Sequence, residues 1–177
     1  MVGMRQRLVD SGFAVAAFDY PYREEGRKAP DRFERLVACH RAVYDHLVGT
    51  LGEAPFLAGK SMGGRIGSHL AVASPGWVFL GYPLVPAGRT VVRDTSHLTA
   101  IGPMLFIQGA RDSLAPLPLL SGVVTGLAHA ELEVIADADH GFRVPKRTGL
   151  DSGAVLDDIA GRMAQWMRPR ARALRRS

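Results

Sequence analysis

The chain has 177 residues, of which 47% are hydrophobic and 22% are charged, so it is long enough to form one folded domain with a buried core. This composition excludes disordered, collagen-like and coiled-coil proteins, and the longest apolar runs are far shorter than the ~20 residues that a membrane-spanning helix needs. The net charge of +5 arises at the C-terminus, because five of the 22 Lys and Arg residues lie in the last ten positions and the remainder balance the 17 acidic residues.

We interpret the basic residues 168–177 as a solvated tail. Binding of nucleic acid through this tail is the less favoured alternative, because no aromatic residues are interleaved with its arginines. Cys39 is the only cysteine, which excludes an intramolecular disulfide and a cysteine-based zinc site. We therefore expect a cytoplasmic protein that is not embedded in a membrane, and the composition leaves the oligomeric state open.

Short apolar segments alternate with segments of helical periodicity along the whole chain. In chain order, we predict a helix at 4–10, a strand at 13–18, a loop at 19–30, a helix at 31–51, a strand at 54–58, a helix at 62–73, a strand at 77–80, a loop at 82–102, a strand at 103–108, a helix at 116–128, a strand at 131–136 and a helix at 150–167. This alternation predicts one α/β domain over residues 1–167, with a mostly parallel sheet that helices cover on both faces.

A G-x-S-x-G motif, residues 59–63, follows the predicted strand at 54–58 and precedes a predicted helix. In such a sheet, functional groups gather at the carboxyl ends of the strands. A tight turn between strand and helix exposes the hydroxyl of Ser61, and the two flanking glycines, Gly59 and Gly63, leave room for a close approach. The backbone N–H of Met62 is then placed to stabilise developing negative charge. The motif therefore predicts a nucleophilic serine.

Two further polar residues follow strands and complete this arrangement. Asp112 comes after the strand at 103–108, and His140 comes after the strand at 131–136. A serine hydroxyl needs a base, and the base needs a carboxylate that orients it, so we expect Asp112 and His140 to meet Ser61 at one edge of the sheet. The order Ser61, Asp112, His140 is the one found in α/β-hydrolases.

Other polar residues have competing interpretations. Asp137 and Asp139 are alternatives to Asp112 as the orienting acid, but as close sequence neighbours of His140 they are better explained as turn residues. A metal site built from these two aspartates and His140 lacks a second cluster of ligands. His97 belongs to the long loop, where a surface position is favoured over one beside the active site.

Two residues of the predicted helix at 31–51 are interpreted as structural. His40 lies on the apolar stripe of that helix, so we expect a buried imidazole with a satisfied hydrogen bond. Cys39 is adjacent to it and carries no local sign of activation, which indicates a core position.

Several segments together resemble the α/β-hydrolase superfamily, in particular its dienelactone-hydrolase-like branch. The similarity is strongest to small bacterial proteins that share a hydrolase-like domain with a regulatory subunit of an animal histone-acetyltransferase complex. It extends from about residue 5 to residue 167 and is carried by residues 18–22, 26–31, 59–65 and 80–83, by Gln108, Gly109 and Asp112, and by Asp139 and His140. Dienelactone hydrolases themselves are less similar, because their nucleophile is a cysteine and Ser61 stands in its place.

This resemblance also implies that the sequence is incomplete at its N-terminus. Members of the superfamily carry further strands and a His-Gly-rich loop before the helix that corresponds to residues 4–10, and that loop supplies a second oxyanion amide. One of those strands lies between the strands that correspond to residues 13–18 and 54–58. Because buried strand edges without partners are not tolerated, either these two strands pair directly or the protein begins upstream of Met1, and we favour the second alternative.

The residues and the resemblance together predict a serine hydrolase that acts on an ester, a thioester or an amide. No cofactor and no metal are needed for this chemistry, and the expected partner is a small acyl substrate. The alternative is a non-catalytic, hydrolase-like scaffold with half of its oxyanion hole missing, because the loss of one donor lowers the rate by about 10²–10³.

Overall fold

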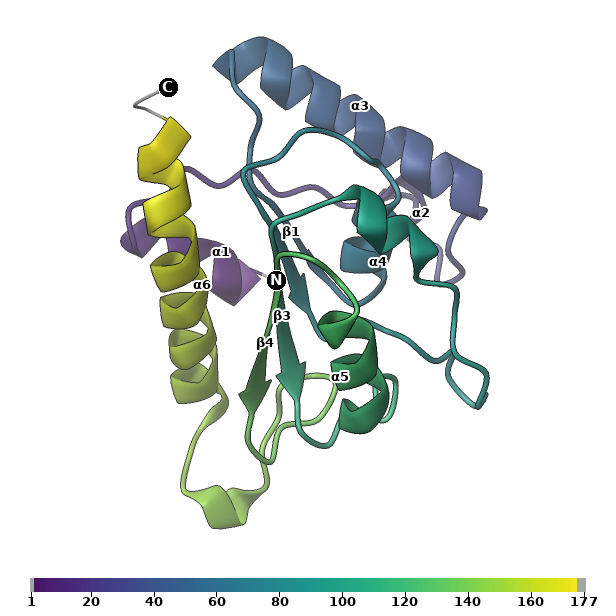
Figure 1. Ribbon diagram of the computed structural model, residues 1–177, viewed down its shortest axis with the longest axis vertical. Helices are drawn as coiled ribbons and strands as arrows, with labels where there is room; N and C mark the ends of the chain where they lie inside the picture. The colour runs from purple at the N-terminus through teal and green to yellow at the C-terminus, as the bar shows by residue number, and fades with distance from the viewer. Residues whose placement is uncertain (1, 175–177) are drawn as a thin grey trace.

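A parallel sheet of four strands, in the order β1-β2-β3-β4, forms the centre of the computed structural model, which describes residues 2–174 (Figure 1). The strands are β1 (Leu57–Lys60), β2 (Trp77–Leu80), β3 (Met104–Gly109) and β4 (Ala130–Ile135). Their order in the sheet is their order in the chain, so each connection returns to start a neighbouring parallel strand. The predicted parallel sheet is therefore confirmed, and all four carboxyl ends lie at the same edge.

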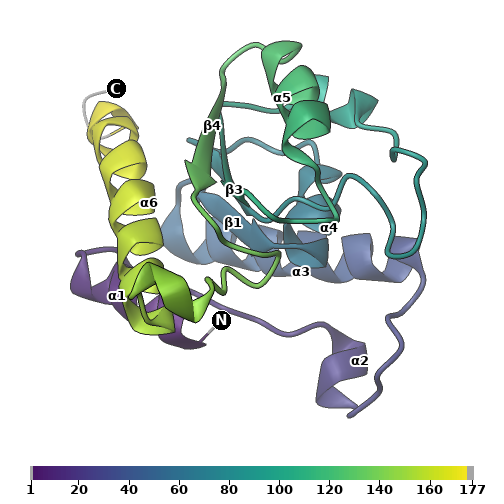
Figure 2. The same ribbon diagram turned by 90° about the horizontal axis from the view of Figure 1, so that it is seen from below.

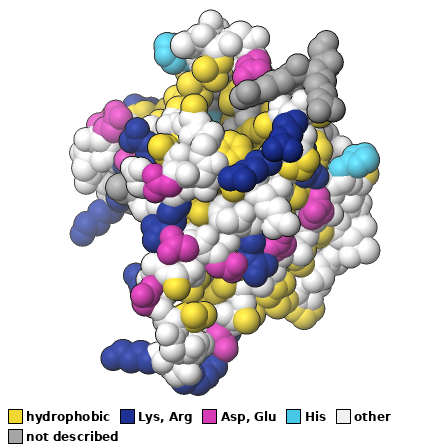
Figure 3. Space-filling model, turned by 90° about the vertical axis from the view of Figure 1, so that its left-hand side faces the viewer, with side chains coloured by type: hydrophobic (Ala, Val, Ile, Leu, Met, Phe, Trp, Pro, Cys, Tyr) yellow, Lys and Arg dark blue, Asp and Glu magenta, His cyan; other side chains and the backbone are white. Residues whose placement is uncertain are grey.

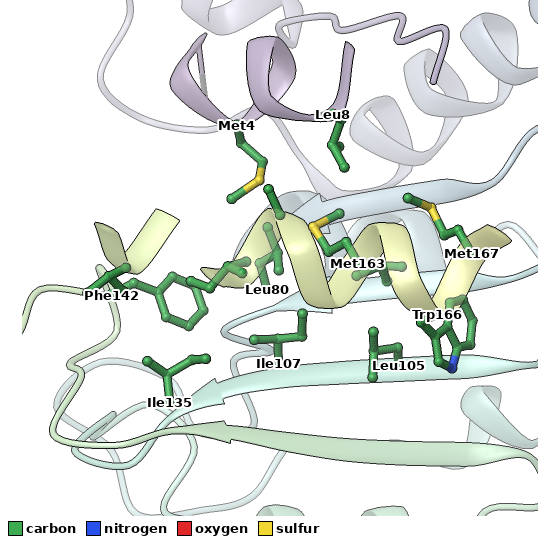
Figure 4. Close-up of a cluster of buried hydrophobic side chains, with 14 of the residues drawn as sticks. Met4, Leu8, Leu80, Leu105, Ile107, Ile135, Phe142, Met163, Trp166 and Met167 are labelled. Atoms are coloured by element: carbon green, nitrogen blue, oxygen red, sulfur yellow. The ribbon is translucent and has the colours of Figure 1, made fainter. Parts of the chain in front are cut away.

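Alternate residues of the two central strands point into two separate cores. Val78, Leu80, Leu105 and Ile107 face one side of the sheet, where they pack with residues of the first and last helices (Figure 4). Trp77, Phe79, Met104 and Phe106 face the other side. All eight side chains are almost completely buried. Continuous apolar runs are typical of parallel strands that are covered on both faces, which explains why β2 and β3 could be predicted from the sequence.

Helices cover both faces of the sheet. Helices α1 (Val2–Asp10) and α6 (Ser152–Leu174) lie together on one side, and α3 (Phe33–Leu51), α4 (Met62–Ser68) and α5 (Leu117–Thr125) lie on the other (Figures 1 and 2). Three short helices interrupt the connections: α2 (Pro21–Glu24), η1 (Ser96–Ala100) and η2 (Lys146–Thr148). Helices α2 and η1 lie inside segments that were predicted to be loops. The predicted helix at 62–73 is shorter than expected, because α4 ends at Ser68.

The predicted strand at residues 13–18 is wrong. These residues are extended but form no ladder, and within the described residues no strand pairs with the outer edge of β1. Phe13 and Val15 still pack against the core beside α1 and α6, whereas Phe18 is 38% exposed. An apolar segment becomes a strand only if a neighbouring backbone supplies the hydrogen bonds, and here none does.

The closing helix does not stop at residue 167 but continues through Pro169 to Leu174. The guanidinium of Arg170 lies 3.8 Å from the centre of the Trp166 ring and pairs with Glu131 at 2.9 Å. Arg168 donates to the carbonyl of Ser11. The prediction of a solvated tail from residue 168 is therefore wrong for Arg170, whereas Arg168 is exposed, and Arg175 and Arg176 lie outside the described residues.

The surface over α1 and α6 carries basic and acidic side chains side by side (Figure 3). Arg7 pairs with Asp157 at 2.6 Å, and Arg162 pairs with both Glu133 and Asp158. Basic residues on this face are thus largely neutralised by near neighbours. Within residues 2–174, no helix combines the length and the apolar character that crossing a membrane would require.

Candidate active site

Ser61 lies on the sharp turn between β1 and α4, at the carboxyl edge of the sheet. Its backbone has φ 51° and ψ −121°, a positive-φ conformation that costs energy for any residue with a side chain. The Ser61 N–H donates to the carbonyl of Leu80 at 2.9 Å, which ties the turn to β2. The strained turn lifts the hydroxyl away from the sheet, as expected from the G-x-S-x-G motif.

Two glycines allow this turn to close, but they are not the two expected from the motif. A Cβ on Gly59 would lie 2.3 Å from the backbone nitrogen of Gly64, and a Cβ on Gly64 would lie 2.7 Å from the carbonyl oxygen of Gly59. A Cβ on Gly63 would meet nothing within 4 Å. The close approach predicted for Gly59 and Gly63 is therefore made by Gly59 and Gly64, because α4 crosses β1 one residue later than the motif suggests.

The structure brings Ser61, His140 and Asp112 together although they come from three different connections. Nε2 of His140 lies 2.8 Å from Oγ of Ser61, and Nδ1 of His140 lies 2.7 Å from Oδ2 of Asp112. Gly81 lies beside the imidazole with φ 62°, a conformation that favours glycine. The side chain of His140 is 27% exposed and that of Asp112 is fully buried. The hydroxyl and the ring are thus open to an incoming molecule, while the carboxylate is shielded.

Asp112 is held by three hydrogen bonds besides being buried. One oxygen accepts from His140 and from the side-chain amide of Gln108, and the other accepts from the N–H of Leu114 at 2.8 Å. Burial alone would raise the pKa of this carboxyl, but the hydrogen bonds from His140 and Leu114 outweigh it and hold the pKa below its usual value. Asp112 therefore stays ionised, which favours the Nδ1–H tautomer of His140.

Gln108 was noted in the sequence only as part of the family resemblance, and its contact with Asp112 was not predicted. It is the only amide side chain in β3 and is completely buried in a strand that is otherwise apolar. A buried polar residue in such a strand needs a hydrogen-bond partner, so this position offered a usable signal.

The two competing aspartates serve the loop that carries His140. Asp139 accepts hydrogen bonds from the N–H groups of Gly141 and Arg143, and Asp137 pairs with Arg147 at 2.5 Å. Neither carboxylate hydrogen-bonds to His140 in the described part of the chain. Their interpretation as turn residues is confirmed. The described residues also contain no cluster of three His, Cys, Asp or Glu that could hold a metal ion.

The N–H of Met62 begins α4 directly after Ser61. Within residues 2–174 this N–H donates no hydrogen bond, so it is free to bind a ligand oxygen. An N–H in the first turn of a helix has no partner inside the helix and is a ready donor to an anion. The position expected for an oxyanion donor is therefore occupied by a free backbone N–H.

His40 is buried as expected, whereas Cys39, expected in the core, is partly buried at the edge of a core cluster. His40 is buried, and its Nδ1 lies 3.1 Å from the hydroxyl of Tyr20. Burial lowers the pKa of His40 to about 4, so the ring is neutral at pH 7. Burial also raises the pKa of the Cys39 thiol, which keeps it protonated and unreactive.

His97 is partly exposed, and within the described residues it forms no hydrogen bond with Ser61 or His140. It is half-buried against α4, with its Nε2 2.9 Å from Oγ of Ser68 and 3.3 Å from the hydroxyl of Tyr82. Its ring stacks on that of His69. The surface position favoured for His97 is therefore only partly correct. Periodicity could not have revealed its contact with α4, because His97 lies in an irregular connection.

Comparison with known proteins agrees with this architecture. A family model described as "Alpha/beta hydrolase domain" matches residues 1–168. A lidless α/β serine hydrolase from Xanthomonas campestris is similar in structure, with a TM-score of 0.71, 19% identity and coverage of 95% of this chain and 72% of that one. An esterase domain from Rhodothermus marinus has a TM-score of 0.68 at 17% identity and covers 95% of this chain and 78% of that one.

An α/β serine hydrolase homologue from Coxiella burnetii is also similar, with a TM-score of 0.65, 16% identity and coverage of 92% of this chain and 75% of that one. At these identities the structural likeness establishes the fold. A search of curated protein sequences found no match to this chain. The family model covers nearly all of the sequence, and the chain therefore belongs to the alpha/beta hydrolase domain family.

Proposed function

We propose that this hydrolase-family protein is a serine hydrolase that cleaves an ester, a thioester or an amide through Ser61, His140 and Asp112. The observation that carries the proposal is the pair of hydrogen bonds at 2.8 Å and 2.7 Å that links the three side chains in series. A buried, ionised carboxylate, an oriented imidazole and a strained, accessible serine are the components that activate a hydroxyl for attack on a carbonyl.

The chemistry proceeds in two halves. Oγ of Ser61 attacks the acyl carbon while Nε2 of His140 accepts the hydroxyl proton, and the resulting oxyanion binds the N–H of Met62. The tetrahedral intermediate collapses as His140 returns the proton to the leaving alcohol, thiol or amine, which leaves an acyl-enzyme. Water then attacks the acyl-enzyme with His140 again as the base, which releases the acid and restores Ser61. Asp112 stays ionised throughout and stabilises the imidazolium.

The finer assignments stay predictions. Membership of the dienelactone-hydrolase-like branch depends on the sequence resemblance alone. The partial exposure of His140 supports an open site and a small acyl substrate. The cytoplasmic location is indicated only by the single cysteine, Cys39.

A fluorophosphonate probe tests the proposal, because it reacts only with an activated serine. We expect the wild-type protein to be labelled and Ser61→Ala to be unlabelled. Ser121→Ala is the matched control, since Ser121 is exposed on α5 and should not change labelling. Equal labelling of Ser61→Ala would contradict the assignment. A folded wild-type protein that is not labelled would instead support the non-catalytic scaffold.

A further inference from the structure

A second polar cluster lies at the far end of α4 from the catalytic residues. Arg65 and His69 come from α4 and the residue that caps it, and Arg93 and His97 come from the connection between β2 and β3. The N–H of Arg65 donates to the carbonyl of Ser61 at 3.1 Å, so the two residues are one helical turn apart. Side chains four residues apart lie on the same face of a helix, which places Arg65 and His69 on one face of α4.

Aromatic packing holds the cluster together. The rings of His69 and His97 stack with their centres 3.6 Å apart and their planes inclined by 16°. Phe33, the first residue of α3, meets His69 edge-on at 4.8 Å. The guanidinium of Arg65 faces the Phe33 ring at 5.6 Å. These contacts fix the directions of the imidazoles and of Arg65 without using their hydrogen-bonding capacity.

Three buried nitrogen atoms of the cluster have no hydrogen-bond partner in the described part of the chain: Nε of Arg93, Nε2 of His69 and Nδ1 of His97. An unsatisfied buried polar atom costs about 1–3 kcal/mol, so three in one place require an explanation. The charges are also unmatched, because neither Arg65 nor Arg93 forms an ion pair within residues 2–174. Asp94, the nearby carboxylate, directs its two oxygens to the N–H and the hydroxyl of Ser96.

The titration behaviour agrees with an excess of positive charge. Burial and the neighbouring Arg93 lower the pKa of Arg65, and burial and Arg65 lower the pKa of His69. Burial, together with His69, lowers the pKa of His97 to about 4, and Asp94 only partly offsets this. The cluster thus resists further protonation, and a bound anion would relieve the repulsion.

We propose that Arg65, Arg93, His69 and His97 form a subsite for an oxyanion group, a carboxylate or a phosphate, carried by the acyl substrate. The two guanidiniums supply charge-assisted hydrogen bonds to the anion, and the stacked rings of His69 and His97 hold the cluster rigid. One helical turn is about 5.4 Å, so the subsite is within reach of a substrate whose anionic group lies a few carbon atoms from the scissile carbonyl. This inference rests on the proposed function of Ser61 and narrows its substrate to anionic acyl compounds.

Two aryl esters of equal chain length test the subsite: monoaryl glutarate, which ends in a carboxylate, and its methyl ester, which is neutral. We expect the wild-type protein to prefer the anionic ester in kcat/KM by about 10- to 100-fold, as charge-assisted pairs imply. Arg65→Gln and Arg93→Gln should each lower that ratio by about 10-fold. Arg5→Gln, an exposed change on α1 with the same loss of charge, should keep the wild-type ratio. A ratio near one in the wild-type protein would overturn the inference.

Inorganic phosphate provides a second measurement that does not depend on hydrolysis. Titration followed by the imidazole resonances of His69 and His97 should show saturable shifts in the wild-type protein and weaker binding in Arg93→Gln. Phosphate binding without any preference for the anionic ester would overturn the assignment to substrate and indicate a site for a free anion. Fluorophosphonate labelling separates the two proposals: labelled protein without ester preference contradicts the subsite alone, and absence of labelling contradicts the proposed function as well.

Discussion

At the start of α4, both ring nitrogens of His140 have partners, one in Ser61 and the other in Asp112. At the end of the same helix, His69 and His97 each keep a buried nitrogen without a partner. The cluster of Ser61, His140 and Asp112 contains a carboxylate that binds its imidazole directly. The carboxylate near the basic cluster of Arg65, His69, Arg93 and His97, that of Asp94, binds Ser96 instead. A satisfied network can work on a substrate as it stands, while an unsatisfied one indicates that a ligand completes it.

The largest expected effect is at the orienting carboxylate. Asp112→Asn keeps the shape of the site but no longer enforces the tautomer of His140, so we expect kcat to fall by about 10⁴-fold on a simple aryl ester. Asp139→Asn, which affects a turn hydrogen bond only, should have a much smaller effect. Because Asp112 does not belong to the basic cluster, phosphate binding there, measured by NMR, should be unchanged in Asp112→Asn. If Asp139→Asn were the more damaging change, Asp112 would not be the orienting acid.

Both clusters depend on the position of α4, and Gly59 allows α4 to pack closely against β1. A Cβ there would lie 2.3 Å from the backbone of Gly64, so Gly59→Ala must displace α4. We expect a loss of about 3 kcal/mol or more in the free energy of unfolding, measured in urea. Gly63→Ala is the matched control, because it lies in α4 with open space around it and should change stability by about 1 kcal/mol or less. Equal effects of the two changes would show that the close approach is not needed.

His40, a buried histidine outside both clusters, predicts a dependence of stability on pH. His40 has a partner in Tyr20, and its pKa of about 4 in the folded protein compares with 6.5 for an exposed imidazole. Above pH 6.5 the ring is neutral in both states, and its stabilising effect is complete. As the pH falls from 6.5 to 4, the unfolded chain takes up the proton first, so the free energy of unfolding decreases by about 3 kcal/mol.

Urea unfolding at pH 7 and pH 4.5 measures this loss of stability. His40→Gln should lose less stability between the two values than the wild-type protein does, although it is less stable at pH 7. His46→Gln, an exposed change on the same helix, should behave like the wild-type protein. If the free energy of unfolding of His40→Gln fell between pH 7 and pH 4.5 as much as that of the wild-type protein, His40 would not be the source of the pH dependence.

The smallest expected effect concerns an arginine that does have partners. Arg170 stacks on Trp166 and pairs with Glu131, in contrast to Arg65 and Arg93. Arg170→Gln should lower the free energy of unfolding by about 1 kcal/mol, and Arg172→Gln, an exposed position on the same helix, should leave it nearly unchanged. Thermal melting of the two variants side by side measures the difference, and equal melting temperatures would show that the contact contributes nothing.

Much of the fold follows from local sequence pattern. The apolar runs that became β2 and β3 lie within one residue of their predicted positions, and the residues that follow β1, β3 and β4 meet as expected. The meeting of Ser61, Asp112 and His140 could be predicted because a parallel sheet directs all its strand ends to one edge, so sequence position brings distant residues together.

The predictions that failed have a common cause: each depends on contacts between residues that are distant in the sequence. Residues 13–18 have the composition of a strand, but pairing depends on a neighbour that composition does not reveal. Gly63 and Gly64 are indistinguishable in sequence, and only the crossing of α4 over β1 decides which one must lack a side chain. His97 and Arg93 belong to an irregular connection, so their approach to α4 has no periodic signal.

The two tryptophans of the chain, Trp77 and Trp166, are buried in different cores on opposite faces of the sheet. The indole of Trp166 donates to Glu131 at 2.7 Å and faces the guanidinium of Arg170, whereas Trp77 is enclosed by apolar side chains. Their fluorescence therefore reports the two layers separately. Replacement of either one by phenylalanine leaves a single emitter, so the loosening of the helix pair α1 and α6 can be followed independently of the layer that carries α4.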